Sequence, residues 1–365
     1  MLLLLGGVFM RVTFPHMGNL YVALEGIFTY LGVEVCLPPK TNKETINIGT
    51  RSTPEAACLP FKIVLGNFIQ GIEKGADTVI MLGGNGPCRF GYYGPLAEKI
   101  MQDLGYKFNL IMLEGNNFFD LINKIRVESG VSYWQILEAI RFGWVKLKTI
   151  DDFEKLTVKS RPREKLSGAI SRIFDEAVVL IRGAKNLKEI NLVKKSFFTE
   201  VKKLTLEKEV LKVGLVGDIY MMLEPAANFR VEKMLGALGV EVQRSIYVSD
   251  WLKHNLLPHI RYTYKKRLLG AGYPYLKAFV GGHGLDTVAN SVIYAQKKFD
   301  GVIQILPMTC MPEIVAQSVL PKVQRDHGIP VLTLVLDEHG GEAGFATRIE
   351  AFVDLLHKRK EKNVG

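Results

Sequence analysis

The sequence predicts an α/β protein with two Rossmann-like (flavodoxin-like) parallel-sheet domains, related by duplication, and a helical insertion between them. Three observations predict this fold. Short apolar strands alternate with helices in the first and last thirds of the chain, the middle third has helical spacing only, and the peptide Leu-Gly-Val-Glu-Val occurs at 31–35 and again at 238–242. Strands that alternate with helices form parallel sheets, and 365 residues suffice for two or three domains.

The first alternating part, residues 10–115, is predicted to be the N-terminal domain. Its strands are expected at 11–14, 33–37, 78–82 and 109–113. Its helices are expected at 20–31, 60–73 and 96–104, where apolar residues recur at helical spacing. Prolines at 38 and 39 and the glycines at 83, 84 and 86 supply the turns between these elements.

The middle part, residues 116–210, is predicted to be a helical insertion or bridge. Helices are expected at 118–125, 133–144, 165–181 and 190–204. The C-terminal domain is predicted to span residues 211–365. Its strands are expected at 212–217, 279–284, 301–306 and 331–336, and its helices at 228–238, 285–297, 312–324 and from 347 onward.

The duplication extends beyond the repeated pentapeptide. Asp77-Thr-Val-Ile leads to Cys88 eleven residues later, and Asp300-Gly-Val-Ile leads to Cys310 ten residues later. A repeated order of elements indicates repeated structure more strongly than five matching letters do. We therefore expect two doubly wound lobes whose loops surround a shared cleft.

Composition and charge exclude several classes of protein. With 48% hydrophobic and 23% charged residues the chain is not intrinsically disordered, and four cysteines cannot form a disulfide scaffold. The net charge is +10, and the segment 146–212 holds 17 Lys or Arg against 10 Asp or Glu. A solvated helical face explains this surplus better than nucleic-acid binding, because the segment lacks interleaved aromatic residues and any known binding motif.

The longest apolar run, residues 1–10, is too short to cross a bilayer and lacks the basic region of a signal peptide. It is interpreted as a first strand or as an over-extended start, since residues 1–9 need not belong to the native protein. We therefore expect no membrane association and a cytoplasmic location, where thiols stay reduced.

Three cysteines occupy positions at which an α/β protein binds ligands. Cys88 and Cys310 follow buried strands through loops, and ligands of open parallel sheets bind at the carboxyl ends of strands. Cys58 lies just before a helix, where backbone N–H groups favour a thiolate. The separations of 30 and 222 residues match no compact ferredoxin or zinc-finger spacing. By spacing alone, an iron–sulfur cluster, a zinc ion and three unrelated buried thiols all stay open.

The fourth cysteine, Cys36, also lies at a strand end with a proline nearby. It completes the alternating stretch Val-Glu-Val-Cys, and the duplication places Gln243 at its equivalent position. We therefore expect Cys36 not to be a ligand.

The other candidate residues carry weaker signals. Gly281-Gly-His283-Gly is interpreted either as a strand-to-helix turn or as a seat for an anion on free N–H groups. The loop Asp337-Glu338-His339-Gly-Gly-Glu is interpreted either as solvated or as a site of proton transfer. Arg348 near a helix start hints at a bound anion. No Walker-type ATP motif is present.

Four segments together resemble the 2-hydroxyacyl-CoA dehydratase superfamily. They are Ser52-Thr-Pro-Glu-Ala-Ala-Cys58-Leu-Pro-Phe-Lys, Gly83-Gly-Asn-Gly-Pro-Cys88-Arg-Phe-Gly, Pro307-Met-Thr-Cys310-Met-Pro-Glu and Asp337-Glu-His-Gly-Gly-Glu-Ala-Gly-Phe-Ala-Thr-Arg348. The superfamily includes benzoyl-CoA reductase subunits and double-cubane cluster proteins. The chain is most similar to the branch of CoA-protein activase-like, or dehydratase-activator-related, proteins, and the resemblance runs from Met10 through nearly the whole chain.

The resemblance implies that Cys58, Cys88 and Cys310 hold a [4Fe-4S] cluster with one open iron site. It implies an ATP-hydrolysing iron–sulfur activase that supplies a low-potential electron, an acyl-CoA substrate, and a related second subunit or a homodimer. Glu55, His283, Glu338, His339 and Arg348 are then the candidates for catalytic residues. Four cysteines cannot supply the six ligands of a double-cubane cluster, and no specific CoA-binding motif is visible.

Three functional hypotheses follow. The chain is a catalytic iron–sulfur subunit for ATP-driven reduction or dehydration, a non-catalytic electron-transfer partner that carries the cluster, or a cluster-free ligand-binding protein with two lobes. We favour the first.

Overall fold

The computed structural model describes residues 10–84, 87–113, 122–123, 125–127, 130–256 and 258–362. The chain forms two compact units. Unit 1 consists of Met1–Ala57 and Phe61–Lys146, and unit 2 consists of Cys58–Pro60 and Leu147–Gly365. The predicted strand or start at residues 1–9 lies outside the described residues, as does most of the predicted helix at 118–125.

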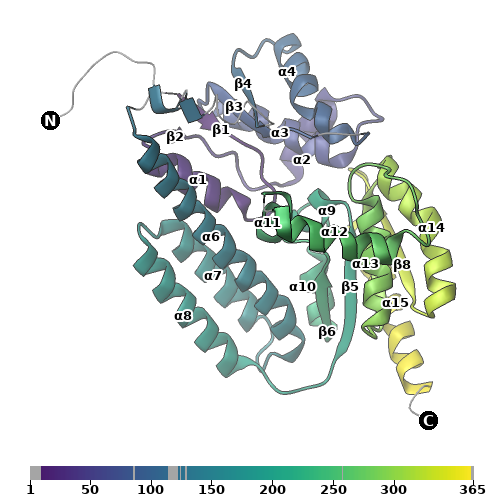
Figure 1. The fold of residues 1–365 in the computed structure, drawn as a ribbon. Coiled ribbons are helices and arrows are strands. Elements are labelled where there is room, and N and C mark those ends of the chain that lie inside the picture. The colour runs from purple at the N-terminus through teal and green to yellow at the C-terminus, as the bar shows by residue number, and fades with distance from the viewer. Residues whose placement is uncertain are drawn as a thin grey trace. The chain divides into compact units, whose positions relative to one another are not determined.

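Unit 1 is built on a four-stranded, all-parallel sheet (Figure 1). Its strands are β1 (Arg11–Thr13), β2 (Glu34–Val35), β3 (Thr78–Leu82) and β4 (Asn109–Leu113), in the order β2-β1-β3-β4. Its helices are α1 (Leu20–Tyr30), α2 (Lys43–Ser52), α3 (Leu59–Glu73), η1 (Arg89–Tyr92), α4 (Tyr93–Asp103) and the first half of α6 (Tyr133–Ser160).

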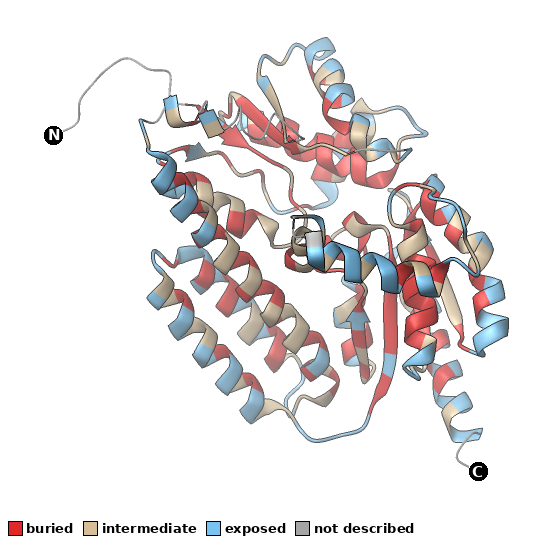
Figure 2. Ribbon diagram, viewed as in Figure 1, coloured by how far each residue is buried: buried red, intermediate tan, exposed pale blue. Residues whose placement is uncertain are grey.

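Helix α3 is the most deeply buried helix of unit 1, and Figure 2 shows it largely red. Small residues let it approach its neighbours: a Cβ on Gly71 would lie 2.1 Å from Oγ1 of Thr13, and one on Gly66 would lie 2.1 Å from the carbonyl oxygen of Thr45. Helix α3 is thereby fixed against β1 and α2, and its N-terminus, which follows Cys58, is fixed with it.

Unit 2 contains a second four-stranded, all-parallel sheet. Its strands are β5 (Leu211–Gly217), β6 (Val240–Arg244), β7 (Gly301–Pro307) and β8 (Val331–Leu336), in the order β6-β5-β7-β8. Helices α7 (Ala169–Gly183) and α8 (Leu187–Leu204) precede the sheet, with η2 (Arg161–Arg163) before them. Six further helices follow β5: α9 (Ile219–Leu223), α10 (Val231–Ala237), α11 (Val248–Leu256), α12 (Pro258–Gly272), α13 (Gly284–Gln296) and α14 (Met311–His327), and α15 (Glu342–Lys362) ends the described chain.

Helices cover both faces of the second sheet. A Cβ on Gly214 of β5 would strike Tyr294 of α13, whereas a Cβ on Gly301 of β7 would strike Phe352 of α15. Gly301 is paired with Val213, the neighbour of Gly214, so the two glycines face opposite sides of the sheet. Helices α13 and α15 therefore pack on opposite faces, and the middle strands β5 and β7 are buried between them (Figure 2).

The two sheets confirm the predicted Rossmann-like pair of parallel sheets. Both have the same strand order, in which β6, β5, β7 and β8 correspond to β2, β1, β3 and β4. The correspondence extends to hydrogen bonds: Asp77 before β3 accepts from the backbone N–H of Arg11 at 3.0 Å, and Asp300 before β7 accepts from that of Lys212 at 2.7 Å. The repeated pentapeptide leads into β2 and β6 at matching positions, as the duplication predicts.

Several predicted elements differ from those observed. The predicted helix at 133–144 is the start of one helix, α6, that continues to Ser160, and α15 begins at Glu342 rather than at 347. The strand expected at 279–284 is wrong, because Gly281 and Gly282 have positive φ and form a turn that leads directly into α13. Helices α2, α11 and α12 were not predicted.

Between β4 and β5 the described residues contain helices and no strand. The division into compact units passes through α6, between Lys146 and Leu147, so the predicted boundaries at 116 and 210 stay predictions. No helix within the described ranges combines the length and the apolar character that crossing a membrane requires.

Candidate functional site

Two of the predicted ligand cysteines occupy equivalent places in the two sheets. Cys88 follows β3 and is the N-cap of η1, which leads directly into α4. Cys310 follows β7, the strand that corresponds to β3, and is the N-cap of α14. Neither residue uses its side chain to cap the helix. Both cysteines therefore lie at the carboxyl ends of matching strands, where open parallel sheets bind ligands.

The segment around Cys58 is joined to the segment around Cys88. The guanidinium of Arg89 donates a hydrogen bond from Nη1 to the carbonyl oxygen of Ala56 at 2.9 Å. Beyond Cys58, the ring of Phe61 contacts that of Tyr93 with 5.0 Å between centroids. These contacts join Ala56 and Phe61, on either side of Cys58 in the sequence, to Arg89 and Tyr93.

All four cysteines are described, and none forms a disulfide. Cys36 differs from the other three in its surroundings, because its backbone N–H donates to the carbonyl oxygen of Val12 and continues the pairing of β2 with β1. Burial, followed by the charge of Glu34, raises the pKa of the Cys36 thiol. In the described part of the chain, no three His, Cys, Asp or Glu side chains gather closely enough to hold a metal ion.

A second group of polar residues lies within unit 2, where its strand order reverses. From β5 the chain continues to β6 on one side of the sheet, and from β7 it continues to β8 on the other side. A crevice is therefore expected between the carboxyl ends of β5 and β7. Glycines bring the backbone close together here. Gly217 ends β5 with φ of +135°, and a Cβ on it would lie 1.9 Å from the carbonyl oxygen of Ile305. A Cβ on Gly284 would lie 2.4 Å from that of Pro312, so the N-termini of α13 and α14 nearly touch.

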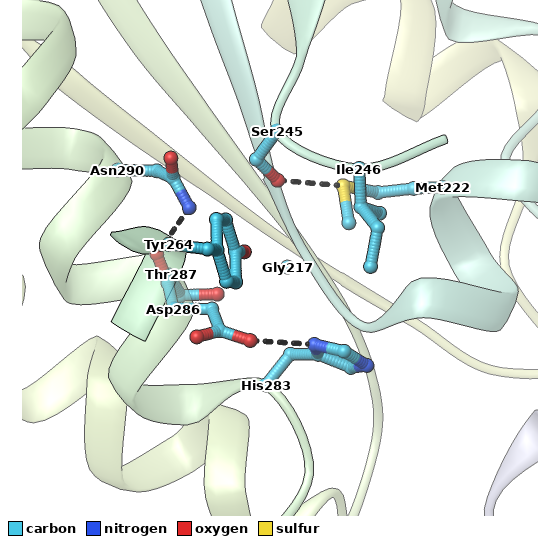
Figure 3. Close-up of a pocket in the computed structure, with 9 residues that line it drawn as sticks. All are labelled: Gly217, Met222, Ser245, Ile246, Tyr264, His283, Asp286, Thr287 and Asn290. Carbon is cyan, nitrogen blue, oxygen red and sulfur yellow. Dashed lines mark hydrogen bonds and ion pairs between the residues drawn. The ribbon is translucent and has the colours of Figure 1, made fainter. Parts of the chain in front are cut away.

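A narrow pocket lies beside this crevice, at the ends of β5 and β6, and Figure 3 shows the nine residues that line it. His283, the N-cap of α13, projects into it, and its Nδ1 lies 2.8 Å from Oδ2 of Asp286. The second ring nitrogen points away from Asp286 (Figure 3). Asn290 donates to the carbonyl oxygen of Asp286 at 2.8 Å and fixes the first turn of the helix. Tyr264 of α12 also lines the pocket, close to Asn290 and Asp286 (Figure 3).

Buried carboxyl groups surround this histidine. Glu313, in the first turn of α14, accepts from Thr287 Oγ1 and from Gln304 Nε2, each at 3.0 Å. Burial raises the pKa of Glu313 to about 7. Burial also raises the pKa of Asp218, which follows Gly217.

The pKa of His283 reflects opposing effects. Burial lowers the pKa of the imidazole, but the hydrogen bond to Asp286 and the charges of Asp286, Asp218 and Glu313 outweigh it, so the pKa lies above its ordinary value. A pair of groups whose environments shift their pKa values toward neutrality is suited to proton transfer.

The remaining predicted candidates lie in less enclosed places. Glu55 is exposed, and its backbone oxygen, rather than its carboxylate, accepts from Lys62 Nζ at 3.1 Å. His339 has an 83% exposed side chain that lies 3.7 Å from Glu338. Arg348 lies in the second turn of α15, and its guanidinium donates a hydrogen bond to the carbonyl oxygen of Thr333 at 2.8 Å. This hydrogen bond gives Arg348 a structural role that needs no bound anion.

Sequence reasoning missed Asp218, Asp286 and Glu313. Each carried a signal that was not used: Asp218 directly follows a glycine at the end of an apolar strand, and the other two lie three residues after a helix N-cap. Their common surroundings arise from the convergence of the N-termini of α13 and α14, which only the tertiary structure shows.

The two units also correspond at the residue that precedes the crossover helix. Helix α3 precedes β3, and helix α13 precedes β7, the third strand of each sheet in chain order. Each helix ends five positions before its strand begins. Cys58 directly precedes α3, and His283 directly precedes α13. The same place in the duplicated fold thus carries a thiol in one copy and an imidazole in the other.

Comparison with known proteins gives one family match. Residues 15–81 match the family model described as the CoA enzyme activase uncharacterised domain. The matched segment runs from the end of β1 into β3 and includes Cys58. No curated protein is similar enough to the chain to count as a match. Residues 15–81 are therefore a CoA enzyme activase-related domain, which confirms the relation to the CoA-protein activase-like branch that the sequence motifs predict.

Proposed function

We propose that the protein is an iron–sulfur subunit of a 2-hydroxyacyl-CoA dehydratase-like system. Cys58, Cys88 and Cys310 would hold one [4Fe-4S] cluster, and an ATP-dependent activase would deliver a low-potential electron to it. The observation that carries the proposal is the placement of Cys88 and Cys310 at the ends of corresponding strands in two sheets of identical order. The match to the activase-related family supports the same system.

The donor set fits such a cluster. Thiolates are the usual protein ligands of iron–sulfur clusters. Cys58 and Cys310 directly precede helices of 15 and 17 residues, and the N-terminal end of a helix stabilises a thiolate. Cys36 fits poorly, because its raised pKa disfavours the thiolate.

Each part of the chain would have a defined task. When bound, a [4Fe-4S] cluster supplies a one-electron carrier of low potential. The hydrogen bond from Arg89 to Ala56 holds the segments of Cys58 and Cys88 together before any cluster is present. The burial of Cys58 and Cys310 would limit the access of water to the cluster and so protect it.

The proposal also concerns location and partners. We expect the cytoplasm as the location, because a reducing compartment keeps the thiols available. The activase is the expected partner, either with a related second subunit or with a second copy of the chain. An acyl-CoA thioester is the expected substrate class.

Anaerobic purification followed by iron and sulfide analysis tests the proposal. We expect a brown protein with about four irons and a paramagnetic signal after reduction. Cys58→Ser, Cys88→Ser and Cys310→Ser should each lose most of the iron, whereas the matched control Cys36→Ser should keep it. Turnover of an acyl-CoA with activase and ATP separates a catalytic subunit from an electron carrier.

Three results would contradict the cluster. A colourless protein from iron-replete anaerobic cells would favour the cluster-free ligand-binding alternative. Stoichiometric zinc would favour a structural metal site. Equal iron loss in all four serine variants would show that Cys58, Cys88 and Cys310 do not differ from Cys36 in holding iron.

A further inference from the structure

The proposed cluster does not use the histidine pocket of unit 2, although this pocket lies at the carboxyl ends of strands β5 and β6. His283 projects from the N-terminus of α13 into a pocket bounded by the ends of β5 and β6 and by α12. Its side chain is 17% exposed, which leaves it accessible to a small group while shielding most of the ring from water.

The hydrogen bonding of His283 leaves one nitrogen available. Nδ1 is held by the carboxylate of Asp286 at 2.8 Å, and the side chain makes no hydrogen bond to cap the helix. Within the described residues, Nε2 makes no hydrogen bond, and Figure 3 shows it directed away from Asp286. A carboxylate on one nitrogen fixes the tautomer and orientation of an imidazole and leaves the other nitrogen to act on a ligand.

Groups on three elements face this imidazole. Asp286 comes from α13, Asp218 from the end of β5, and Glu313 from the first turn of α14. Tyr264 of α12 lies close to Asp286 and Asn290, and burial raises its pKa, so it stays a neutral phenol. Asp286, Asp218 and Glu313 raise the pKa of the ring and so favour its protonated form.

The duplicated fold gives an independent reason to regard His283 as functional. It takes the place before α13 that Cys58, a proposed cluster ligand, takes before the corresponding helix α3. This place lies at the carboxyl edge of the sheet, where open parallel sheets bind ligands.

We propose that His283 and Asp286 form an acid–base pair that exchanges a proton with an oxygen atom of a carbonyl-containing ligand in the pocket at the ends of β5 and β6. The ligand class, an acyl-CoA thioester, rests on the proposed function. In one direction the N–H bond at Nε2 breaks, the proton goes to the ligand oxygen, and the bonding electron pair stays on Nε2. In the other direction the Nε2 lone pair takes the proton back. Nδ1 keeps its hydrogen toward Asp286 throughout.

Two measurements on the full chain test the pair. The first follows the histidine ring resonances by NMR as acetyl-CoA is added, with the His283 signal assigned by its loss in His283→Gln. We expect this signal to shift with acetyl-CoA and its pKa to fall in Asp286→Asn. Neither result requires a cluster. A His283 signal that ignores acetyl-CoA would overturn the proposal.

The second measurement compares iron content and turnover of a 2-hydroxyacyl-CoA with activase and ATP. We expect His283→Gln to keep its iron and to lose about 10²-fold or more in turnover, the size of a general acid–base contribution. The matched control is His357→Gln, on an exposed position of α15.

The outcomes separate the two proposals. Turnover of His283→Gln within twofold of the unmodified chain would overturn the acid–base pair and leave the cluster intact. Loss of iron in His283→Gln would also overturn it, because His283 would then be a cluster ligand. An unmodified chain without iron would refute the proposed function, and the response of His283 to acetyl-CoA would still decide the pair.

Discussion

Replacement of Arg244 by methionine should destabilise unit 2 and disturb the pocket. Arg244 ends β6, and its side chain is only 3% exposed. It forms ion pairs with Glu154 of α6 and, at 3.1 Å, with Glu232 of α10, and its guanidinium lies 4.3 Å from the ring centroid of Tyr247. The next residues, Ser245 and Ile246, line the pocket of His283, so this ion-pair cluster fixes one wall of the candidate site.

The size of the effect follows from burial. The side chains of Glu154 and Glu232 are 15% and 19% exposed, and Arg244→Met removes the cation that forms an ion pair with each of them. Breaking a buried ion pair in this way costs about 3–5 kcal/mol. For a domain of this size each kcal/mol lowers the melting temperature by about 2–4 °C, so a decrease of roughly 6–20 °C is expected.

The loss of stability in Arg244→Met should depend on pH. Burial raises the pKa of Glu232 and the charge of Arg244 lowers it, so removal of Arg244 raises this pKa further. A carboxyl group whose pKa is higher in the folded state binds protons preferentially there, and stability then falls as pH rises. The penalty of Arg244→Met should therefore be smaller at pH 5 than at pH 8.

Thermal unfolding followed by circular dichroism measures both effects. Lys203→Met is the matched control, since it breaks an exposed pair with Glu200 and should cost at most about 0.5 kcal/mol. Adding Glu154→Gln and Glu232→Gln to Arg244→Met should restore much of the stability, because the two carboxylates that lost Arg244 are then replaced by neutral amides. A melting temperature of Arg244→Met within 2 °C of the control, or a larger penalty at low pH, would refute this reasoning.

Three further predictions concern individual residues. Arg89→Met removes the hydrogen bond to Ala56 and should speed iron loss to a chelator by about tenfold, as expected for one charge-assisted hydrogen bond. An unchanged rate of iron loss would show that Arg89 does not position the segment of Cys58. Gly217→Ala should lower the free energy of unfolding, measured with urea, by at least ~2 kcal/mol, because φ is +135° and a Cβ would strike a backbone oxygen of β7. Gly239→Ala, with open space around it, should lower it by about 1 kcal/mol. Burial raises the pKa of Asp151 to about 6, so stability should fall as pH rises from 4 to 6 and above, and Asp151→Asn should stabilise more at pH 7.5 than at pH 4.5 in the same assay.

The sheets were predictable because their strands are short apolar runs that depend little on tertiary context. The predicted ranges 78–82 and 109–113 coincide with β3 and β4. Helix α12 was missed for a physical reason: it packs against α13 and buries Leu268, but most of its other residues are exposed or half-buried, so it has no clear apolar stripe. Helix α2 was missed although Asn42 and Thr45 form a capping box that marks its start.

The sequence was sufficient to predict which segments carry the candidate site residues, but not which side chains lie next to one another in the folded protein. The cysteine contexts and the glycine-rich turn before α13 both identified segments at the carboxyl edges of the sheets. The carboxyl groups around His283 could not be predicted, because Asp218 and Glu313 are distant in sequence and are brought near the ring only by the crossing of the chain between β5 and β7.

The duplication explains how one fold can carry two kinds of chemistry. At the end of the third strand both copies keep a cysteine, Cys88 and Cys310, as expected if both serve one shared group. Before the crossover helix the copies differ, with Cys58 in the first and His283 in the second. At the end of the second strand they differ again, since Cys36 corresponds to Gln243. A position whose side chain has the same task in both copies should keep the same residue type, whereas a position with different tasks should differ. By this criterion Cys88 and Cys310 are the pair expected to share a task, and Cys58 and His283 are expected to have separate tasks.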